Sequence, residues 1–261
     1  MFNYEIWTPD HFEKNSDEQH GLVVEIYGGP GSQKVLNRWS FGLSSHFATS
    51  NCSTCLNAIH VKLDARGSGN SGDEMMHATY KKLGWFEKVD ITEFVRALVF
   101  NQPTINWLNP ISGKIDADKT AIWGWSYGGF ATLHTLSLGD DVWKCGVSAA
   151  ALNSRYYYDS IYTEMAMDTP ENNFDGYSNG TVTDQGLNNL KKVKLTMLHG
   201  TADDNVHFQN GALISKELVK AGVEFNNYFY ADEAHHMTGN ADRHAYRLIF
   251  RKIEDCFEGE L

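Results

Sequence analysis

The sequence predicts an α/β fold in which a mostly parallel sheet is covered by helices on both faces. Two observations predict it: short apolar runs rich in β-branched residues alternate with segments of helical periodicity, and glycines mark several of the joins. Strand–helix–strand alternation implies a parallel sheet, and ligands bind such sheets beyond the carboxyl ends of the strands. We therefore expect functional residues directly after the strands.

The expected elements follow one another without a repeat, a proline-rich linker or a low-complexity tract. The strands are residues 22–27, 58–63, 120–124, 144–149, 194–199 and 224–230. The helices are about residues 86–101, 127–138, 207–221 and 240–255. In the first of these helices, apolar side chains recur at Val89, Phe94 and Leu98, a spacing typical of a helix face. We expect a single domain that spans residues 1–261.

The composition excludes several classes of protein. Hydrophobic residues make up 42% and charged residues 21% of the chain, as in soluble globular proteins. The formal net charge of −11 argues against binding to nucleic acid or to an anionic membrane surface, because both require a basic face. No run approaches the ~18 apolar residues of a membrane span. Residues 1–10 also lack the basic and apolar regions of a signal peptide.

Residues 124–128 read Gly-Trp-Ser-Tyr-Gly, a match to G-x-S-x-G, and another glycine, Gly129, follows. An expected strand enters this motif and an expected helix leaves it, which is the setting of the nucleophile elbow in α/β-hydrolases. The turn is so sharp that flanking side chains would clash, which explains the glycines. The helix N-terminus also favours developing negative charge. We therefore expect an α/β-hydrolase fold with Ser126 as the nucleophile.

A serine hydroxyl becomes a good nucleophile only when a base takes its proton and an acid orients that base. In the α/β-hydrolase fold these residues follow in the order serine, acid, histidine. The strand that ends at His199 is followed by Asp203 and Asp204, and the last strand is followed by His235 and His236. The order is met, but the chemistry leaves open which aspartate and which histidine take part.

Other chemistries find less support. No H-E-x-x-H pattern and no metal-binding Cys/His spacing occurs, so we expect neither a metal nor a cofactor. The glycine-rich residues 67–72 lack the Gly-Lys-Ser/Thr ending of a phosphate-binding loop. Cys52 and Cys55 lie in a polar loop before a strand rather than at the start of a helix, which disfavours a redox pair.

Six sequence blocks together are more specific than any one motif. They are residues 27–33 (Tyr-Gly-Gly-Pro-Gly-Ser-Gln), 64–69, 82–87, 123–129, 157–164 and 199–207. Through these blocks the chain resembles, over nearly its whole length, the catalytic domain of the prolyl oligopeptidase family in its dipeptidyl peptidase IV branch. The resemblance implies that Asp203 is the acid and His235 the base.

The same resemblance implies how substrate is bound. The Tyr27 hydroxyl and the backbone N–H of Tyr127 would form the oxyanion hole, in which a preset donor is worth about 3 kcal/mol. Asn205 would donate to a substrate carbonyl. The side chains implied to form the pocket for a penultimate proline or alanine are Trp125, Tyr158, Tyr162 and Val206.

Further features of the resemblance concern the compartment. Cys145 and Cys256 match a disulfide of the branch, and Asn179 matches a glycosylated position; Asn51 begins a second glycosylation sequon. Together these imply an extracellular or cell-surface protein. The branch also implies a homodimer.

Two departures from the family are visible. Its members carry an N-terminal β-propeller, preceded by a membrane anchor, and neither is found in this sequence; we expect the chain to be truncated relative to the family. In addition, His236 stands where the family usually has glycine.

We therefore expect a serine exopeptidase that removes N-terminal X-Pro or X-Ala dipeptides through an acyl-enzyme intermediate. One alternative is an esterase or acyl hydrolase of the same fold. Residues 27–30, Tyr-Gly-Gly-Pro, favour the peptidase, because such esterases use an HGGG-type loop. The other alternative is a catalytically silent binding subunit, against which the intact Ser126 argues.

Overall fold

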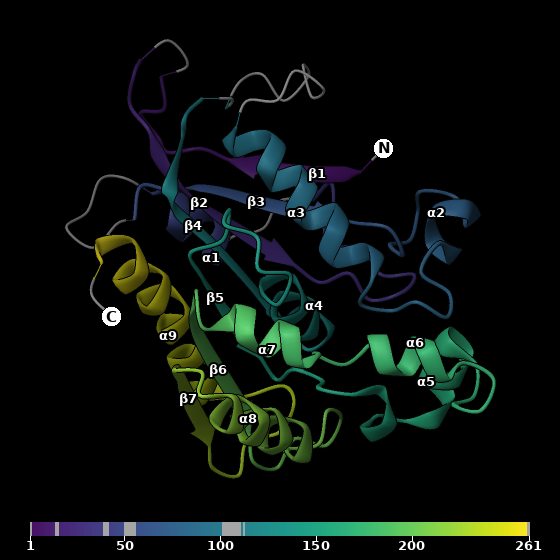
Figure 1. Cartoon of the computed structure of the whole chain (residues 1–261). Helices are drawn as coiled ribbons and strands as arrows, with labels where there is room; N and C mark the ends of the chain where they lie inside the picture. Colours follow the sequence, from purple (N-terminus) through teal and green to yellow (C-terminus); the bar gives the residue numbers. More distant parts are fainter. Residues whose placement is uncertain are drawn as a thin grey trace.

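A computed structural model of the chain describes residues 2–13, 16–38, 42–49, 56–100, 111 and 113–259. Its strands form one sheet in the order β1-β3-β2-β4-β5-β6-β7 (Figure 1). The strands are β1 (Asn3–Trp7), β2 (His20–Ile26), β3 (Ile59–Asp64), β4 (Ile115–Trp125), β5 (Cys145–Ala149), β6 (Lys194–Gly200) and β7 (Phe225–Tyr230). Only the β1–β3 pair is antiparallel within this sheet. The mostly parallel sheet that the sequence predicts is therefore confirmed.

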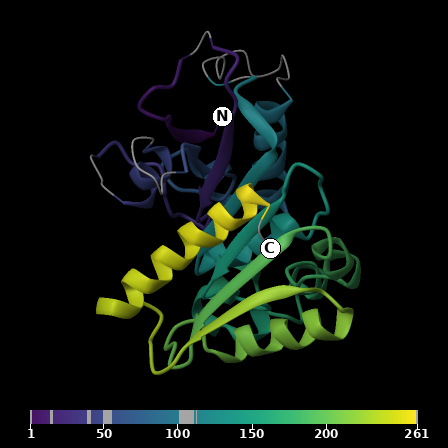
Figure 2. The ribbon, with the colours of Figure 1, turned by 90° about the vertical axis from the view of Figure 1, so that its left-hand side faces the viewer.

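Helices cover both faces of the sheet, as predicted. The α-helices are α1 (Leu43–Ala48), α2 (Asp73–His77), α3 (Phe86–Val99), α4 (Tyr127–Leu136), α5 (Ser160–Met167), α6 (Phe174–Asn179), α7 (Asp184–Leu190), α8 (Gln209–Ala221) and α9 (Gly239–Glu258), and a short 3₁₀ helix, η2, spans Arg155–Tyr157. The helices α3, α4, α7 and α8 lie on one face, while α1 and α9 lie on the other. Figure 2 shows α9 running obliquely across the strands.

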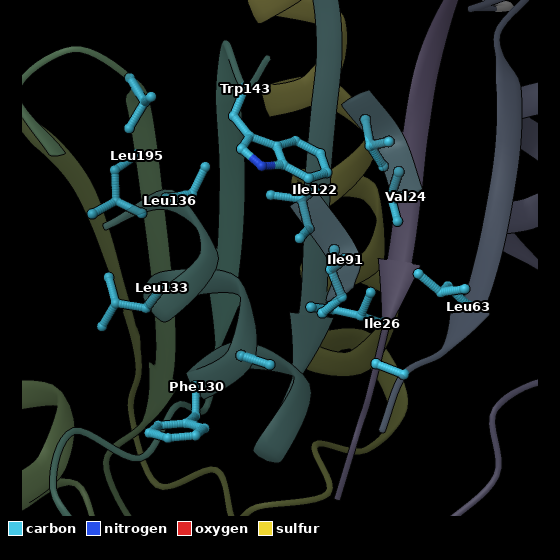
Figure 3. Close-up of a cluster of buried hydrophobic side chains, with 14 of the residues drawn as sticks. Val24, Ile26, Leu63, Ile91, Ile122, Phe130, Leu133, Leu136, Trp143 and Leu195 are labelled. Carbon is cyan, nitrogen blue, oxygen red and sulfur yellow. The ribbon is translucent and has the colours of Figure 1, made fainter. Parts of the chain in front are cut away.

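Each face of the sheet packs its own hydrophobic core. Along β2, Leu22, Val24 and Ile26 belong to the core beneath α3 and α4, whereas Val23 belongs to the core beneath α9. This alternation follows from the two-residue period of a strand. Figure 3 shows part of the first core, with Phe130 and Trp143 among the labelled side chains. A sheet buried on both faces explains why its strands read as continuous apolar runs.

A disulfide ties the second face together. Cys145 in β5 is bonded to Cys256 near the end of α9, across a sequence separation of 111 residues. The pairing that the family resemblance implied is therefore present. In α9, Ala245, Ile249 and Ile253 lie fully buried against the same face. Within the described residues, no helix has both the length and the apolar character needed to cross a membrane.

The expected strands and helices all occur, with ends that differ by a few residues; residue 101, the last of one expected helix, lies outside the described part of the chain. The sequence did not predict α1, α2, α5, α6 or α7. These elements are five to eight residues long. A helix this short completes too few turns for its hydrophobic period to stand out.

Candidate active site

The backbone at Ser126 is strained. Ser126 lies between β4 and α4 with φ 62° and ψ −120°, a conformation that is sparsely populated for residues other than glycine. Such a conformation costs about 1–3 kcal/mol and persists only where the surroundings enforce it. Here the Ser126 N–H donates a 2.8 Å hydrogen bond to the Ala149 carbonyl at the end of β5. The sheet and the helix therefore hold the serine at the tip of a sharp turn.

The glycines of the elbow are required by close backbone contacts. A Cβ atom on Gly128 would lie 2.3 Å from the Ile26 carbonyl oxygen, and one on Gly124 would lie 2.5 Å from the Gly128 carbonyl. Both distances are far below van der Waals contact with backbone that cannot move aside. The strand-to-helix crossing is thus possible only without these side chains, as the motif indicates.

The structure brings Ser126, His235 and Asp203 together from three different loops. His235 Nε2 lies 2.9 Å from Ser126 Oγ, and His235 Nδ1 lies 2.8 Å from Asp203 Oδ2. The alternatives lie elsewhere: His236 is exposed, and Asp204 accepts the backbone N–H of His235 instead. The geometry therefore selects one aspartate and one histidine from the pairs that the chemistry left open.

Asp203 is held firmly in place. Its Oδ1 accepts the backbone N–H groups of Asn205 at 3.0 Å and Val206 at 2.8 Å. His199 Nε2 lies 3.4 Å from Oδ2 and 2.7 Å from the Val206 carbonyl, so it braces the loop. Burial by itself raises the pKa of Asp203, but the hydrogen bonds from His199, His235 and the backbone outweigh it and hold the pKa well below its usual range. The carboxylate therefore stays ionised beside the imidazole.

Two tyrosines flank Ser126. Tyr27 directly follows β2, and its hydroxyl is hydrogen-bonded to Ser126. Burial raises the pKa of Tyr27, while this hydrogen bond and the charge of Arg155 partly oppose the rise, so the phenol stays a neutral donor. Tyr127 is the first residue of α4, and N–H groups of the first helical turn have no partner within the helix. Both donors that the resemblance implied for an oxyanion hole thus lie next to the serine.

Glu87, to which the sequence reasoning gave no role, lies beneath this site. Its carboxyl is fully buried and accepts a 2.5 Å hydrogen bond from the Tyr127 hydroxyl. It also accepts the backbone N–H of Gly84, at 3.0 Å to one oxygen and 3.2 Å to the other. Burial raises the pKa of Glu87. The sequence signal for Glu87 was its place in residues 82–87, one of the six blocks that resemble the family. Its contact with Tyr127, 40 residues away, cannot be inferred from that block.

A small cavity of about 50 Å³ opens beside Ser126. It is lined by Tyr27, Ser126, Tyr127, Leu152, Arg155, Tyr158, Tyr162 and Val206. Three of the side chains expected to form a substrate pocket are among them. Trp125 is not: its Nε1 donates to the His235 carbonyl at 3.2 Å, and its ring stacks on Tyr246 with centroids 6.1 Å apart. Successive side chains of β4 point to opposite faces of the sheet. Trp125 points its ring to the face on which α9 packs, opposite to the cavity.

Asn205 lies at the edge of this group. Its Oδ1 accepts a 2.7 Å hydrogen bond from the Tyr158 hydroxyl, which links the loop that carries Asp203 to the tyrosine-rich residues 156–158.

Asn210, which the sequence reasoning missed, contacts these tyrosine-rich residues from the protein interior. It is fully buried, accepts the backbone N–H of Asn153 and donates to the Tyr157 carbonyl.

Arg155 is the third residue that the sequence reasoning missed, after Glu87 and Asn210. It opens the 3₁₀ helix η2 and is only 2% exposed, although it lines the cavity. A basic residue inside the tyrosine-rich run 154–158 is a visible signal, but the run alone does not tell that the arginine is buried.

Of the two predicted glycosylation sites, Asn179 lies within the described residues and Asn51 does not. Asn179 is exposed at the end of α6. Asn51, Cys52 and Cys55 lie outside the described residues.

The sequence and the fold of this chain are similar to those of known proteins. A model of the prolyl oligopeptidase family matches residues 45–260. Dipeptidyl peptidase 4 of Sus scrofa is 40% identical over 259 residues, and prolyl endopeptidase FAP of Homo sapiens is 34% identical over 256 residues. The matches cover 98% and 97% of this chain but 31% of each relative. The crystal structure of Porphyromonas gingivalis dipeptidyl peptidase 4 superposes with a TM-score of 0.83 at 33% identity, covering 98% of this chain and 33% of that one. The chain thus spans about a third of the length of these proteins.

Proposed function

This chain belongs to the prolyl oligopeptidase family, and on that premise we propose that it is a serine exopeptidase that removes N-terminal dipeptides ending in proline or alanine. The observation that carries the proposal is the continuous hydrogen-bonded line from Ser126 Oγ through His235 to Asp203, with distances of 2.9 and 2.8 Å. These distances lie within the reach that a nucleophile, its base and the orienting acid require.

In the proposed mechanism Ser126 Oγ attacks the scissile carbonyl carbon while His235 Nε2 takes the hydroxyl proton. Asp203 accepts the Nδ1–H of His235, which fixes the tautomer and stabilises the imidazolium that forms. The tetrahedral intermediate collapses to an acyl-enzyme, and His235 gives its proton to the leaving amine. In the second half, a water gives a proton to His235 Nε2 while its oxygen attacks the acyl carbon. The bond from that carbon to Ser126 Oγ then breaks, His235 returns the proton to Oγ, and the dipeptide leaves.

The oxyanion of the intermediate would be stabilised by the Tyr27 hydroxyl and the backbone N–H of Tyr127. A raised pKa suits Tyr27 for this work, because a neutral phenol donates a hydrogen bond whereas a phenolate would repel the oxyanion. The position of Tyr127 at the start of α4 adds the favourable end of the helix dipole.

The cavity beside Ser126 would bind the residue whose carbonyl is attacked. Its walls include the rings of Tyr158 and Tyr162 and the buried side chain of Val206, and a volume of about 50 Å³ suits a small side chain such as proline or alanine. Asn205 uses its carbonyl oxygen to accept from Tyr158, so its amide NH₂ is the group that would donate to a substrate carbonyl.

Two activities are compared in one experiment. Hydrolysis of a Gly-Pro chromogenic amide and of a short-chain aryl ester is measured together with labelling by a fluorophosphonate, which reacts with activated serines. The variant Ser126→Ala removes the nucleophile, and Ser178→Ala, a change at an exposed serine of α6, is the matched control.

We expect the amide to be cleaved and Ser126 to be labelled, with both signals lost in Ser126→Ala and kept in Ser178→Ala. Ester cleavage without amide cleavage would favour an esterase or acyl hydrolase instead. If the fluorophosphonate does not label Ser126 in the wild type, both enzymatic functions are overturned and a catalytically silent binding subunit is favoured.

We further propose an extracellular or cell-surface location, glycosylation at Asn179 and a homodimer. The Cys145–Cys256 disulfide supports the location, because such bonds persist in oxidising compartments. The exposure of Asn179 supports the modification. A mass shift on glycosidase treatment that disappears in Asn179→Gln is the expected result, and light scattering of the secreted chain measures the oligomeric state. Free thiols at both cysteines of secreted protein would contradict the location.

A further inference from the structure

The guanidinium of Arg155 is buried against two aromatic rings at the cavity beside Ser126. Its Cζ lies 4.2 Å from the ring centroid of Phe130 and 4.8 Å from that of Tyr127. The two ring centroids lie 5.2 Å from each other, so both rings lie toward the same side of the guanidinium, and an aromatic ring accepts an N–H only weakly. The five N–H donors at the edges of the plane must therefore find their acceptors in other directions.

One edge of this guanidinium lacks acceptors. Within the described residues, neither Nε nor Nη2 of Arg155 has a hydrogen-bond partner, although both atoms are buried. These two nitrogens form the side edge of the guanidinium, whose parallel N–H bonds match the two oxygens of a carboxylate. Arg66 uses the same edge in this molecule: its Nε lies 2.8 Å from Asp90 Oδ2 and its Nη2 lies 2.5 Å from Asp90 Oδ1.

Among the described residues that line the cavity, none besides Arg155 carries a charged side chain. The other residues that line the cavity are tyrosine, serine, leucine and valine. Burial raises the pKa values of Tyr27 and Tyr162, so these phenols stay neutral. Glu87 lies behind the wall and already accepts hydrogen bonds from Tyr127 and Gly84. Burial raises its pKa as well and outweighs the opposing effect of the Arg155 charge.

We propose that Arg155 determines specificity by pairing with a short acidic side chain, aspartate, on the substrate residue whose carbonyl Ser126 attacks. The inference rests on the proposed peptidase function and extends its substrates beyond proline and alanine at this position. A volume of about 50 Å³ is several times the ~10–15 Å³ that one water needs, which admits a short side chain and not a long one.

The test compares fluorogenic Gly-Asp, Gly-Asn and Gly-Pro amides, because aspartate and asparagine differ in charge but hardly in shape. The ratio of kcat/KM for Gly-Asp to that for Gly-Asn is measured in the wild type, Arg155→Met and Arg155→Lys. Arg247→Met, which removes an exposed arginine of α9, is the matched control. Thermal unfolding of each variant verifies that it folds.

We expect a wild-type ratio of at least about tenfold in favour of Gly-Asp, since a charge-assisted bidentate pair is among the stronger contacts. Arg155→Met lowers the ratio to about one. Arg155→Lys gives an intermediate ratio, because lysine keeps the charge but loses the paired donors. Arg247→Met leaves the ratio unchanged.

A wild-type ratio near one, or a ratio that survives in Arg155→Met, overturns this inference, while cleavage of Gly-Pro that depends on Ser126 would leave the proposed function standing. If none of the amides is cleaved, the proposed function fails. The affinities of the dipeptides Gly-Asp and Gly-Asn for Ser126→Ala, measured by calorimetry, then decide the role of Arg155 without turnover. Tenfold tighter binding of Gly-Asp supports the role, and equal affinities overturn it.

Discussion

The Tyr127 hydroxyl donates a 2.5 Å hydrogen bond to Oε1 of Glu87, a carboxyl with no exposure to solvent. The bond joins the first residue of α4 to the first turn of α3. This bond bears on the active site because the backbone N–H of the same Tyr127 is a proposed donor to the oxyanion. Glu87 therefore positions the elbow from a neighbouring helix without touching substrate.

Replacing Glu87 by alanine should destabilise the fold. The change leaves the Tyr127 hydroxyl and the Gly84 N–H buried without their acceptor, and each such group costs about 1–3 kcal/mol. Urea unfolding measures the loss. Glu87→Gln is the control, since glutamine keeps an acceptor oxygen in the same place and should lose less. Equal stabilities of Glu87→Ala and the wild type would contradict the prediction.

Replacing Gly128 by alanine should disrupt the elbow. The added Cβ would lie 2.3 Å from the Ile26 carbonyl oxygen, so β2 and α4 must separate. We expect a loss of stability above about 2 kcal/mol, in the range of severe core overpacking, and no labelling of Ser126 by a fluorophosphonate. Gly42→Ala is the matched control, because nothing lies within 4 Å of its added Cβ and its φ of −177° is open to any residue. Normal labelling of Gly128→Ala would show that the contact can relax.

Removing the Cys145–Cys256 disulfide should lower the free energy of unfolding by about 2–5 kcal/mol. The bond closes a loop with a sequence separation of 111 residues, and in the chain-entropy model long loops stabilise most because they constrain the unfolded chain most. The double variant Cys145→Ala/Cys256→Ala is compared with the wild type by denaturant unfolding. Repeating both under reducing conditions is the control, and the difference should shrink there.

The stability contributed by Asp203 should depend on pH. Because its pKa in the folded protein lies below the unfolded value of about 3.9, its contribution is fully present above that value and is lost as the pH falls through the folded pKa. The gap in unfolding free energy between the wild type and Asp203→Asn should therefore be largest near neutral pH and narrow below about pH 4. Asp175→Asn, at an exposed position, controls for the loss of one charge. A gap that is independent of pH would contradict the assignment.

Much of the fold could be predicted because its signals are local. The strand before Ser126, the glycines around it and the helix after it follow one another in the chain, so sterics of neighbouring residues suffice to predict the elbow. The short helices α5, α6 and α7 escaped prediction because their positions depend on packing against segments distant in sequence. Lys81, for example, pairs with Asp168 at the end of α5.

The sequence by itself determined the alternation of strands and helices, the place of Ser126 and the order of acid and histidine, since each depends on neighbouring residues or on chain order. Only the tertiary structure decided that Asp203 and His235 meet Ser126 while Asp204 and His236 do not. It also moved Trp125 out of the cavity and placed Arg155, two of whose guanidinium nitrogens are buried without a partner, among the residues that line it. The physical reason is that burial and hydrogen bonding join loops up to 109 residues apart, and packing of the whole sheet, not local preference, fixes where those loops meet.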